Sequence, residues 1–163
     1  MLIFGGMNSM ITDISEISDL FSIFHDGSIS KYINYSDHAI LHIDCMYLAE
    51  RFDEDFDHFI LKIYGIKNIE LKLWAEEENQ SPIIIDSKVI FQIPLDIQDG
   101  EVKSNNVVIH VGANAHPSLD NFSGDLSFEC SGVEIFDPKL KQLTFKELVQ
   151  VCEQYWKDFE NRK

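Results

Sequence analysis

Positive charge is scarce in this chain of 163 residues. There are 13 Lys and Arg residues against 28 Asp and Glu residues, so the formal net charge is −15. Binding to DNA or RNA requires clustered Lys and Arg side chains, so this balance argues against a nucleic-acid partner. An anionic membrane surface is disfavoured for the same reason. The charge would instead speed association with a basic protein partner.

Cysteine is scarce too, and long apolar runs are absent. Cys45, Cys130 and Cys152 form no C-x-x-C pair, which excludes a zinc ribbon and a thioredoxin-like motif. An odd number of cysteines without a disulfide framework indicates a reducing compartment. No segment approaches the ~20 apolar residues that cross a bilayer, and the first residues lack the basic and apolar regions of a signal peptide. We therefore expect a cytoplasmic protein with no membrane partner.

Familiar catalytic signatures are missing as well. The sequence contains no G-x-S-x-G nucleophile motif, no H-E-x-x-H zinc motif and no glycine-rich phosphate loop between a strand and a helix. Residues 53–57 begin like a calcium-binding loop, but His58 and Tyr64 occupy the positions that require Gly and Glu. We predict no metal and no cofactor.

Strand-like alternation dominates what is present. Apolar residues recur at every second position in residues 39–45, 59–63, 69–73 and 107–111. We interpret residues 83–93 as one long strand or two short ones. Asp99-Gly100 has the composition of a hairpin turn, and residues 126–135 fit a hairpin around Ser131-Gly132.

Two segments have helical spacing instead. Residues 12–25 predict a short helix that Thr12 or Asp13 can cap, with Gly27 at a positive φ beyond its end. Thr144-x-x-Glu147 is a capping box that starts an amphipathic C-terminal helix.

The apolar stripe of that last helix includes Trp156 and Phe159, which we expect to be buried against a sheet. No repeat or linker divides the chain, so residues 1–163 form a single domain. The predicted fold class is α+β, mainly antiparallel β as a sandwich- or barrel-like sheet. A short N-terminal helix and the amphipathic C-terminal helix, packed on the sheet, complete it.

Two acidic loops are the candidate partner-binding segments. We expect them to be exposed and to share one face, where they would attract a basic protein. Their members are Asp53, Glu54, Asp55 and Asp57 in the first loop, and Glu76, Glu77 and Glu78 in the second.

Two polar clusters are candidate sites of another kind. His25 and Asp26 form a His-Asp dipeptide, which binds metal in the all-helical HD phosphohydrolases, but this chain is rich in strands after residue 28. His110, His116 and Asp120 supply two imidazoles and a carboxylate, the donor types of an open metal site. Their spacing fits no ligand pattern, so we favour structural roles in a turn and a loop for both clusters.

One segment resembles a known group of proteins. The pattern is Leu20-x-x-x-Phe24-His25-Asp26-Gly27-x-Ile29, an alternating strand, and then Phe59-x-Leu61-x-Ile63-x-Gly65-Ile66-x-x-Ile69. It is similar to a pattern in small uncharacterised bacterial proteins with a Phe-His-Asp-Gly motif, some of which resemble immunity proteins of polymorphic-toxin systems. The resemblance covers about a third of the chain and implies a small acidic intracellular protein that binds and blocks a toxin domain. It assigns no functional residue.

Three functions follow as alternatives. The first is a non-enzymatic binding protein, an immunity-type inhibitor of a basic toxin or other protein partner. The second is a small-ligand or metal-dependent enzyme that uses His110, His116 and Asp120. The third is a structural homodimer, joined by a sheet face or by the terminal helix.

Overall fold

The computed structural model describes residues 9–162, and of Glu78 it describes the backbone alone. Within these residues one antiparallel sheet of ten strands is accompanied by four α-helices, which confirms the predicted α+β class. The helices are α1 (Ile14–Ile23), α2 (Met46–Ala49), α3 (Ser87–Ile90) and α4 (Phe145–Glu160), with a 3-10 helix η1 (Glu78–Gln80). The strands are β1 (Ser28–Asn34), β2 (His38–Asp44), β3 (His58–Tyr64), β4 (Lys67–Leu73), β5 (Ile83–Ile84), β6 (Leu95–Lys103), β7 (Asn106–Ala113), β8 (Phe122–Glu129), β9 (Gly132–Phe136) and β10 (Gln142–Leu143).

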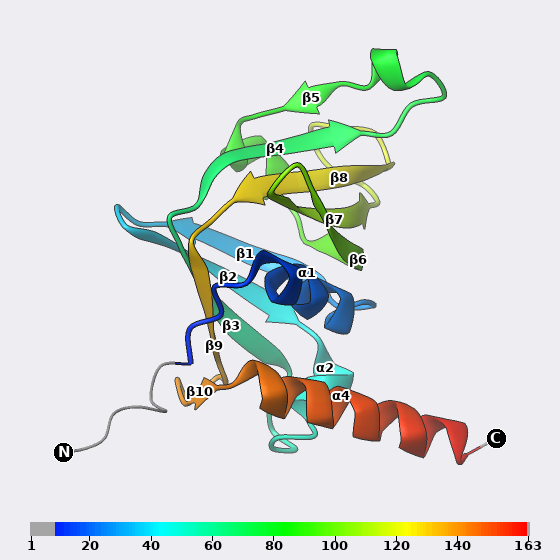
Figure 1. Cartoon of the computed structure of the whole chain (residues 1–163). Coiled ribbons are helices and arrows are strands. Elements are labelled where there is room, and N and C mark those ends of the chain that lie inside the picture. The colour runs from blue at the N-terminus through cyan, green and yellow to red at the C-terminus, as the bar shows by residue number, and fades with distance from the viewer. Residues whose placement is uncertain (1–8, 163) are drawn as a thin grey trace.

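The two halves of the sheet are joined by strand pairing that runs from one half into the other. Its order is β10-β9-β3-β2-β1-β6-β7-β8-β4-β5. Only two residues separate β3 from β4, and only two separate β8 from β9. The β3–β9 pairing therefore continues directly into the β4–β8 pairing, with Tyr64 opposite Gly132 and then Lys67 opposite Glu129. Figure 1 shows the two halves of the sheet running in different directions.

The expected hairpin around Ser131-Gly132 is wrong. β8 pairs with β7 and β4, whereas β9 pairs with β3 and β10, so the two strands are not neighbours. The chain passes from one half of the sheet to the other at this point. Alternation shows that a segment is a strand, but it does not show which strand lies beside it.

Asp99-Gly100 is not a turn either. Both residues lie within β6, where a Cβ on Gly100 would be 2.4 Å from the carbonyl oxygen of Ser18 on α1. The β6–β7 hairpin turns instead at Ser104 and Asn105, whose φ values are 50° and 62°. Two positive φ values match the tight turn that suits the twist of paired strands. Gly100 is thus required by helix packing and not by a turn.

Residues 83–93 are only briefly extended. β5 ends at Ile84, and α3 begins at Ser87, which corrects the expectation of one long or two short strands. The side chain of Asp86 accepts a hydrogen bond from the backbone nitrogen of Lys88 at 2.9 Å and caps α3. Ile90 of α3 is fully buried. Capping and burial therefore outweigh the strand preference of the isoleucines.

α1 packs against both halves of the sheet. Its N-cap is Asp13, one of the two expected caps, which accepts hydrogen bonds from the backbone nitrogens of the first turn. Phe21 packs edge-on against Phe128 of β8, at 6.2 Å between ring centres. Phe24, just past the helix, packs at 5.2 Å against Phe59 of β3. One short helix thus fills the space between strands that are distant in sequence.

The turn after α1 differs from the expectation in one respect. Asp26, and not Gly27, adopts the positive φ, at 66°. Gly27 is needed for a different reason, because a Cβ there would lie 2.6 Å from the carbonyl oxygen of Asp44. The turn at Asp26 and Gly27 therefore brings the end of α1 into direct contact with the end of β2.

α4 begins at the expected capping box. The Thr144 hydroxyl accepts from the Glu147 nitrogen, and the Glu147 carboxylate accepts from the Thr144 nitrogen, both at 3.0 Å. Leu148 is fully buried in the core. The expectation that Trp156 and Phe159 are buried is wrong, because Trp156 is only half-buried and Phe159 is 41% exposed. Figure 1 shows the C-terminal end of α4 reaching past the sheet, so the core cannot cover it.

Between residues 9 and 162, no helix combines the length and the apolar character that a membrane crossing needs.

Candidate functional site

Aromatic side chains gather where the ends of α1, α2 and α4 meet. We call this group the α4 surface. Its members are His25, Tyr47, Tyr155, Trp156 and Phe159. Three separate segments supply them, so no local sequence pattern could have shown that they lie together.

His25 joins α1 to α4. Its imidazole stacks on the indole of Trp156, with 5.4 Å between ring centres and 16° between planes. The Nδ1 of His25 donates to the carbonyl oxygen of Ser22 at 2.9 Å, and the hydroxyl of Tyr47 donates to the carbonyl oxygen of His25 at 2.8 Å. Asp26 is exposed, and its carboxylate lies 3.8 Å from Nε2 of His25. The Phe24–Gly27 motif is therefore a tightly packed turn, and its His25 side chain belongs to the α4 surface.

The remaining rings hold one another in place. Tyr47 and Tyr155 lie 4.7 Å apart, and Trp156 packs edge-on against Tyr155 at 5.0 Å and against Phe159 at 5.5 Å. Phe159, near the end of α4, is 41% exposed. The surface thus presents a fixed aromatic centre with apolar atoms open to solvent.

The first acidic loop lies beside the α4 surface. Arg51, at its start, forms an ion pair of 2.6 Å with Asp158 of α4 and places its guanidinium 5.2 Å from the ring centre of Tyr155. The Arg51 hydrogen bond, with a smaller contribution from Gln154, holds the pKa of Asp158 below its usual value. Arg51 is thereby neutralised, which leaves the loop's carboxylates to set the local charge.

Those carboxylates mostly face solvent. Glu54, Asp55 and Asp57 are exposed, whereas Asp53 is half-buried, and its carboxylate accepts a hydrogen bond from the Asp55 nitrogen at 2.9 Å. A hydrogen bond of 2.7 Å with His58 lowers the pKa of Asp57. The loop is therefore a negatively charged rim next to an aromatic centre.

The second acidic loop lies elsewhere. Glu76 and Glu77 are exposed, and the side chain of Glu78 lies outside the described part of the chain. Figure 1 shows the connection between β4 and β5 at one end of the molecule and the connection between α2 and β3 at the other. The two loops do not form the single acidic face that the charge pattern suggested.

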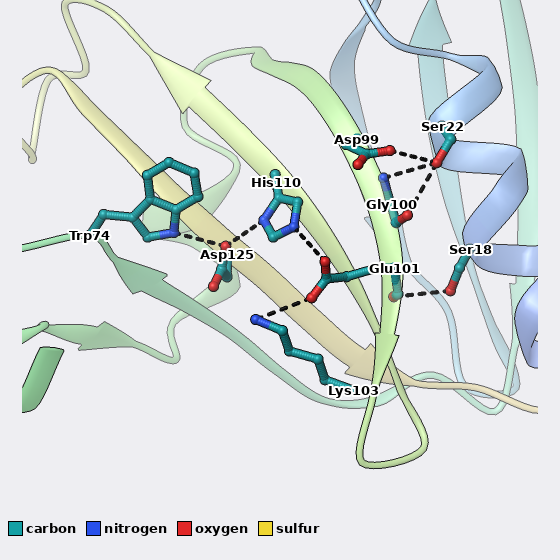
Figure 2. Close-up of polar contacts among 9 residues, drawn as sticks. All are labelled: Ser18, Ser22, Trp74, Asp99, Gly100, Glu101, Lys103, His110 and Asp125. Atoms are coloured by element: carbon teal, nitrogen blue, oxygen red, sulfur yellow. Dashed lines mark hydrogen bonds and ion pairs between the residues drawn. The ribbon is translucent and has the colours of Figure 1, made fainter.

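A polar network surrounds His110 on the outer side of β6, β7 and β8 (Figure 2). Nδ1 of His110 lies 2.7 Å from Asp125, and Nε2 lies 3.1 Å from Glu101. The indole nitrogen of Trp74 donates to the same Asp125 oxygen at 2.8 Å, and Lys103 lies 3.1 Å from Glu101. Burial lowers the pKa of His110, but the hydrogen bonds to Glu101 and Asp125 together raise it above its ordinary value.

This network continues into α1. Ser18 donates to the carbonyl oxygen of Glu101 at 3.0 Å, and Ser22 donates to the carboxylate of Asp99 at 2.7 Å, as Figure 2 shows. Nδ1 of His110 thus lies against Asp125 and Nε2 against Glu101, so each ring nitrogen has a carboxylate partner. Neither nitrogen is turned toward an open position where a metal ion or a substrate could lie. The evident role of His110 is to join three strands.

His116 has different partners. Its Nε2 donates to the carbonyl oxygen of Val89 at 2.9 Å, and its Nδ1 accepts from the backbone nitrogens of Ser118 and Leu119 at 3.1 Å each. The buried ring thereby fixes the loop after β7 against α3. Asp120 is exposed in the same loop and shares no hydrogen bond with either histidine in the structure's described part.

The sequence therefore indicated His110 but not its companions. Glu101 and Asp125 approach it from neighbouring strands, and only the register of β6, β7 and β8 shows this. In residues 9–162 no group of three or more His, Cys, Asp or Glu side chains is arranged to hold a metal ion.

Comparison with known proteins gives no further guide. No family model, no curated protein and no solved structure matches this chain. The resemblance to immunity proteins remains a prediction from the sequence.

Proposed function

We propose that this chain is a non-enzymatic binding protein that docks a basic protein partner on the α4 surface. The observation that carries the proposal is the aromatic end of α4, where Phe159 is 41% exposed beside Tyr155 and Trp156. Centres of protein interfaces are enriched in aromatic residues, Met and Arg, and the largest losses on truncation come from Trp, Tyr and Arg.

The fixed geometry of the rings supports this role. His25 and Tyr47 brace Trp156 and Tyr155 from α1 and α2, so little side-chain freedom is lost when a partner covers them. Binding to rigid aromatic groups costs less conformational entropy than binding to long flexible side chains. The same braces explain why the rings stay together although the core does not cover them.

Charge favours a basic partner over a second copy. Residues 50–57 border the α4 surface and carry Glu54, Asp55 and Asp57 in exposed positions, while Arg51 is paired with Asp158. A second copy would bring the same carboxylates and the same net charge of −15 to the interface. Like charges repel across an interface, whereas Lys and Arg of a partner would be attracted. These charges do not favour the homodimer alternative.

Hydrogen bonding does not favour the enzyme alternative. All four ring nitrogens of His110 and His116 already have partners, which are two carboxylates, a carbonyl oxygen and two backbone nitrogens. Asp120 is not among those partners. A general base must be within hydrogen-bond reach of the proton that it abstracts, and it must have a lone pair to receive it.

The sequence resemblance gives the proposal a more specific form. An immunity-type inhibitor would hold a basic toxin domain by its apolar and cationic residues, and the Phe24–Gly27 motif would contribute His25 and Asp26 to the contact. The matching toxin would be encoded in the neighbouring reading frame.

Site-specific photocrosslinking tests the docking surface directly. A photoreactive amino acid replaces Phe159 in the cells that naturally express the chain, and Tyr35, an exposed aromatic residue between β1 and β2, is replaced as the matched control. We expect one dominant adduct with a basic protein at position 159 and none at position 35. Adducts that are equal at both positions, or absent from position 159, would contradict the proposal.

The identified partner then allows a quantitative test. Trp156→Ala should weaken binding by roughly a hundredfold, as hot-spot aromatics do, whereas Tyr35→Ala should leave it unchanged. Protection of growth on co-expression of the partner, lost in Trp156→Ala, would support the immunity form. Binding without protection would leave docking intact and refute only that form.

A further inference from the structure

β5 forms one end of the sheet. It pairs with β4 alone, and no other strand of the described chain lies beside it. Figure 1 shows β5 on the outside of the molecule, remote from α4. Edge strands are usually protected by charged side chains, bulges or a covering element, because their free backbone groups can pair with another chain.

The register shows which backbone groups are free to pair. Leu73 donates its backbone N–H to the carbonyl oxygen of Pro82 at 2.9 Å, and Lys72 lies opposite Ile83. Residues of an antiparallel pair alternate between those that exchange hydrogen bonds and those that do not. Since Pro82 bonds toward β4, the N–H and C=O of Ile83 point away from β4, toward the open edge.

Apolar side chains surround this edge. Ile83 and Ile85 are 54% and 76% exposed, and Trp74 at the end of β4 is 52% exposed. A surface hollow of about 380 Å³ lies next to them, with Trp74, Ile84 and Phe122 in its lining. Trp74 is held by its hydrogen bond to Asp125, so its ring is already oriented as one wall of the hollow.

Negative charge flanks the edge on both sides. Glu76 and Glu77 precede β5, Asp86 follows it, and Asp120 borders the hollow, all four with exposed side chains. A second copy pairing at β5 would bring these carboxylates together at a close two-fold contact, which is unfavourable. A segment with Lys or Arg at its ends would be attracted instead.

We propose that the β5 edge is a second docking surface, which binds an extended basic segment of a partner protein as an added strand. Main-chain hydrogen bonds to Ile83 would supply the pairing, and alternate side chains of the segment would lie on Ile83 and Ile85 or in the hollow beside Trp74. The carboxylates would select Lys or Arg at the flanks. This surface is separate from the α4 surface and does not depend on the function proposed for it.

A synthetic peptide tests the inference. The probe is the capped peptide Lys-Val-Thr-Val-Thr-Val-Lys, added to the ¹⁵N-labelled full chain and followed by NMR. We expect shifts of the Ile83 and Ile85 amides and of the Trp74 indole N–H, with no shift of the Trp156 indole N–H. The affinity should fall as salt is added, because the flanking charges are exposed.

Two control peptides separate the contributions. A glutamate-flanked version should bind roughly tenfold or more weakly, since its ends meet like charges. A version with all of its internal backbone amides methylated should not bind, because neither of its edges can donate to β5. Equal binding of either control peptide would overturn the proposal, as would the absence of shifts at Ile83.

Two substitutions complete the test. Ile85→Lys places a positive charge where the basic peptide would lie and should weaken binding roughly tenfold or more. Val102→Lys, at an exposed apolar position on β6, is the matched control and should bind like the unmodified chain. If Ile85→Lys binds normally, the edge is not the site. If sedimentation shows a dimer that Ile85→Lys dissociates, the occupant is a second copy and the proposal fails.

Discussion

The contribution of the apolar residues of α4 to the stability of the fold should fall from the first turn of the helix to the last. Leu148 is fully buried near the start of the helix, whereas Phe159 near the end is 41% exposed. We predict that Leu148→Ala destabilises the fold strongly and that Phe159→Ala destabilises it weakly. The difference separates a residue that the core covers from one that remains available to a partner.

The burial of each side chain sets the magnitude. Replacing a fully buried Leu by Ala typically costs 2–5 kcal/mol, so we expect about 3 kcal/mol for Leu148→Ala. Full burial of a Phe side chain contributes about 1.5–3 kcal/mol. Phe159 is little more than half covered, so Phe159→Ala should cost about 1 kcal/mol.

Urea denaturation followed by far-ultraviolet circular dichroism measures both values. The slope of the free energy against urea should be the same in both variants, since neither changes the surface exposed on unfolding by much. In thermal scans, each kcal/mol should lower Tm by about 2–4 °C for a domain of this size. Tyr35→Ala, at an exposed position far from α4 in sequence, is the control for loss of a surface ring.

Equal costs for Leu148→Ala and Phe159→Ala would refute this reasoning. That result would mean that the end of α4 belongs to the core, and it would contradict the proposal that the α4 surface is a docking site. Phe159→Ala should reduce the affinity for the partner more than it reduces the stability of the fold.

Three further predictions concern the rest of the fold. Thr144→Ala should destabilise the protein by about 1 kcal/mol in urea, because it removes the N-cap of α4; an unchanged midpoint would contradict the capping role. Gly27→Ala should lower the free energy of unfolding by about 1–3 kcal/mol, since the added Cβ would lie 2.6 Å from a backbone oxygen. Gly112→Ala should lower it clearly less, because the nearest atom to its Cβ is a side-chain nitrogen at 3.3 Å. Equal losses at the two glycines would show that backbone crowding is not the reason for Gly27. The raised pKa of His110 predicts a pH effect: its contribution to stability is complete below the unfolded value of about 6.5 and is lost as the pH rises through the folded pKa. The stability difference between the unmodified chain and His110→Gln should therefore shrink as the pH rises, and a constant difference would refute the charged network.

Much of the local structure could be predicted because its causes are local. Alternation placed strands at residues 39–45, 59–63, 69–73 and 107–111, and β2, β3, β4 and β7 lie there. The capping box at Thr144 and the N-cap at Asp13 form as expected, since each needs only neighbouring residues. These features depend on side-chain period and on hydrogen bonds within one turn.

Predictions that required a partner from elsewhere in the chain were less successful. Ser131-Gly132 looked like a hairpin turn, but β8 and β9 pair with other strands. Asp99-Gly100 looked like a turn, but position 100 requires glycine because Ser18 of α1 packs against it. Both glycines suggest chain reversal in the sequence, but in the structure each is packed closely against a distant segment. A Cβ on Gly100 would meet Ser18, and a Cβ on Gly132 would meet Met10.

The sequence by itself determined the class of the fold, the acidic charge and the start of each main helix, because composition, period and capping act over a few residues. Only the tertiary structure decided where the surfaces lie. It placed Glu101 and Asp125 on either side of His110, and it left Phe159 outside the core. Strand register and the extent of the sheet are properties of the whole packed chain. The sequence of an amphipathic stripe is the same whether the protein's own core or another molecule covers it.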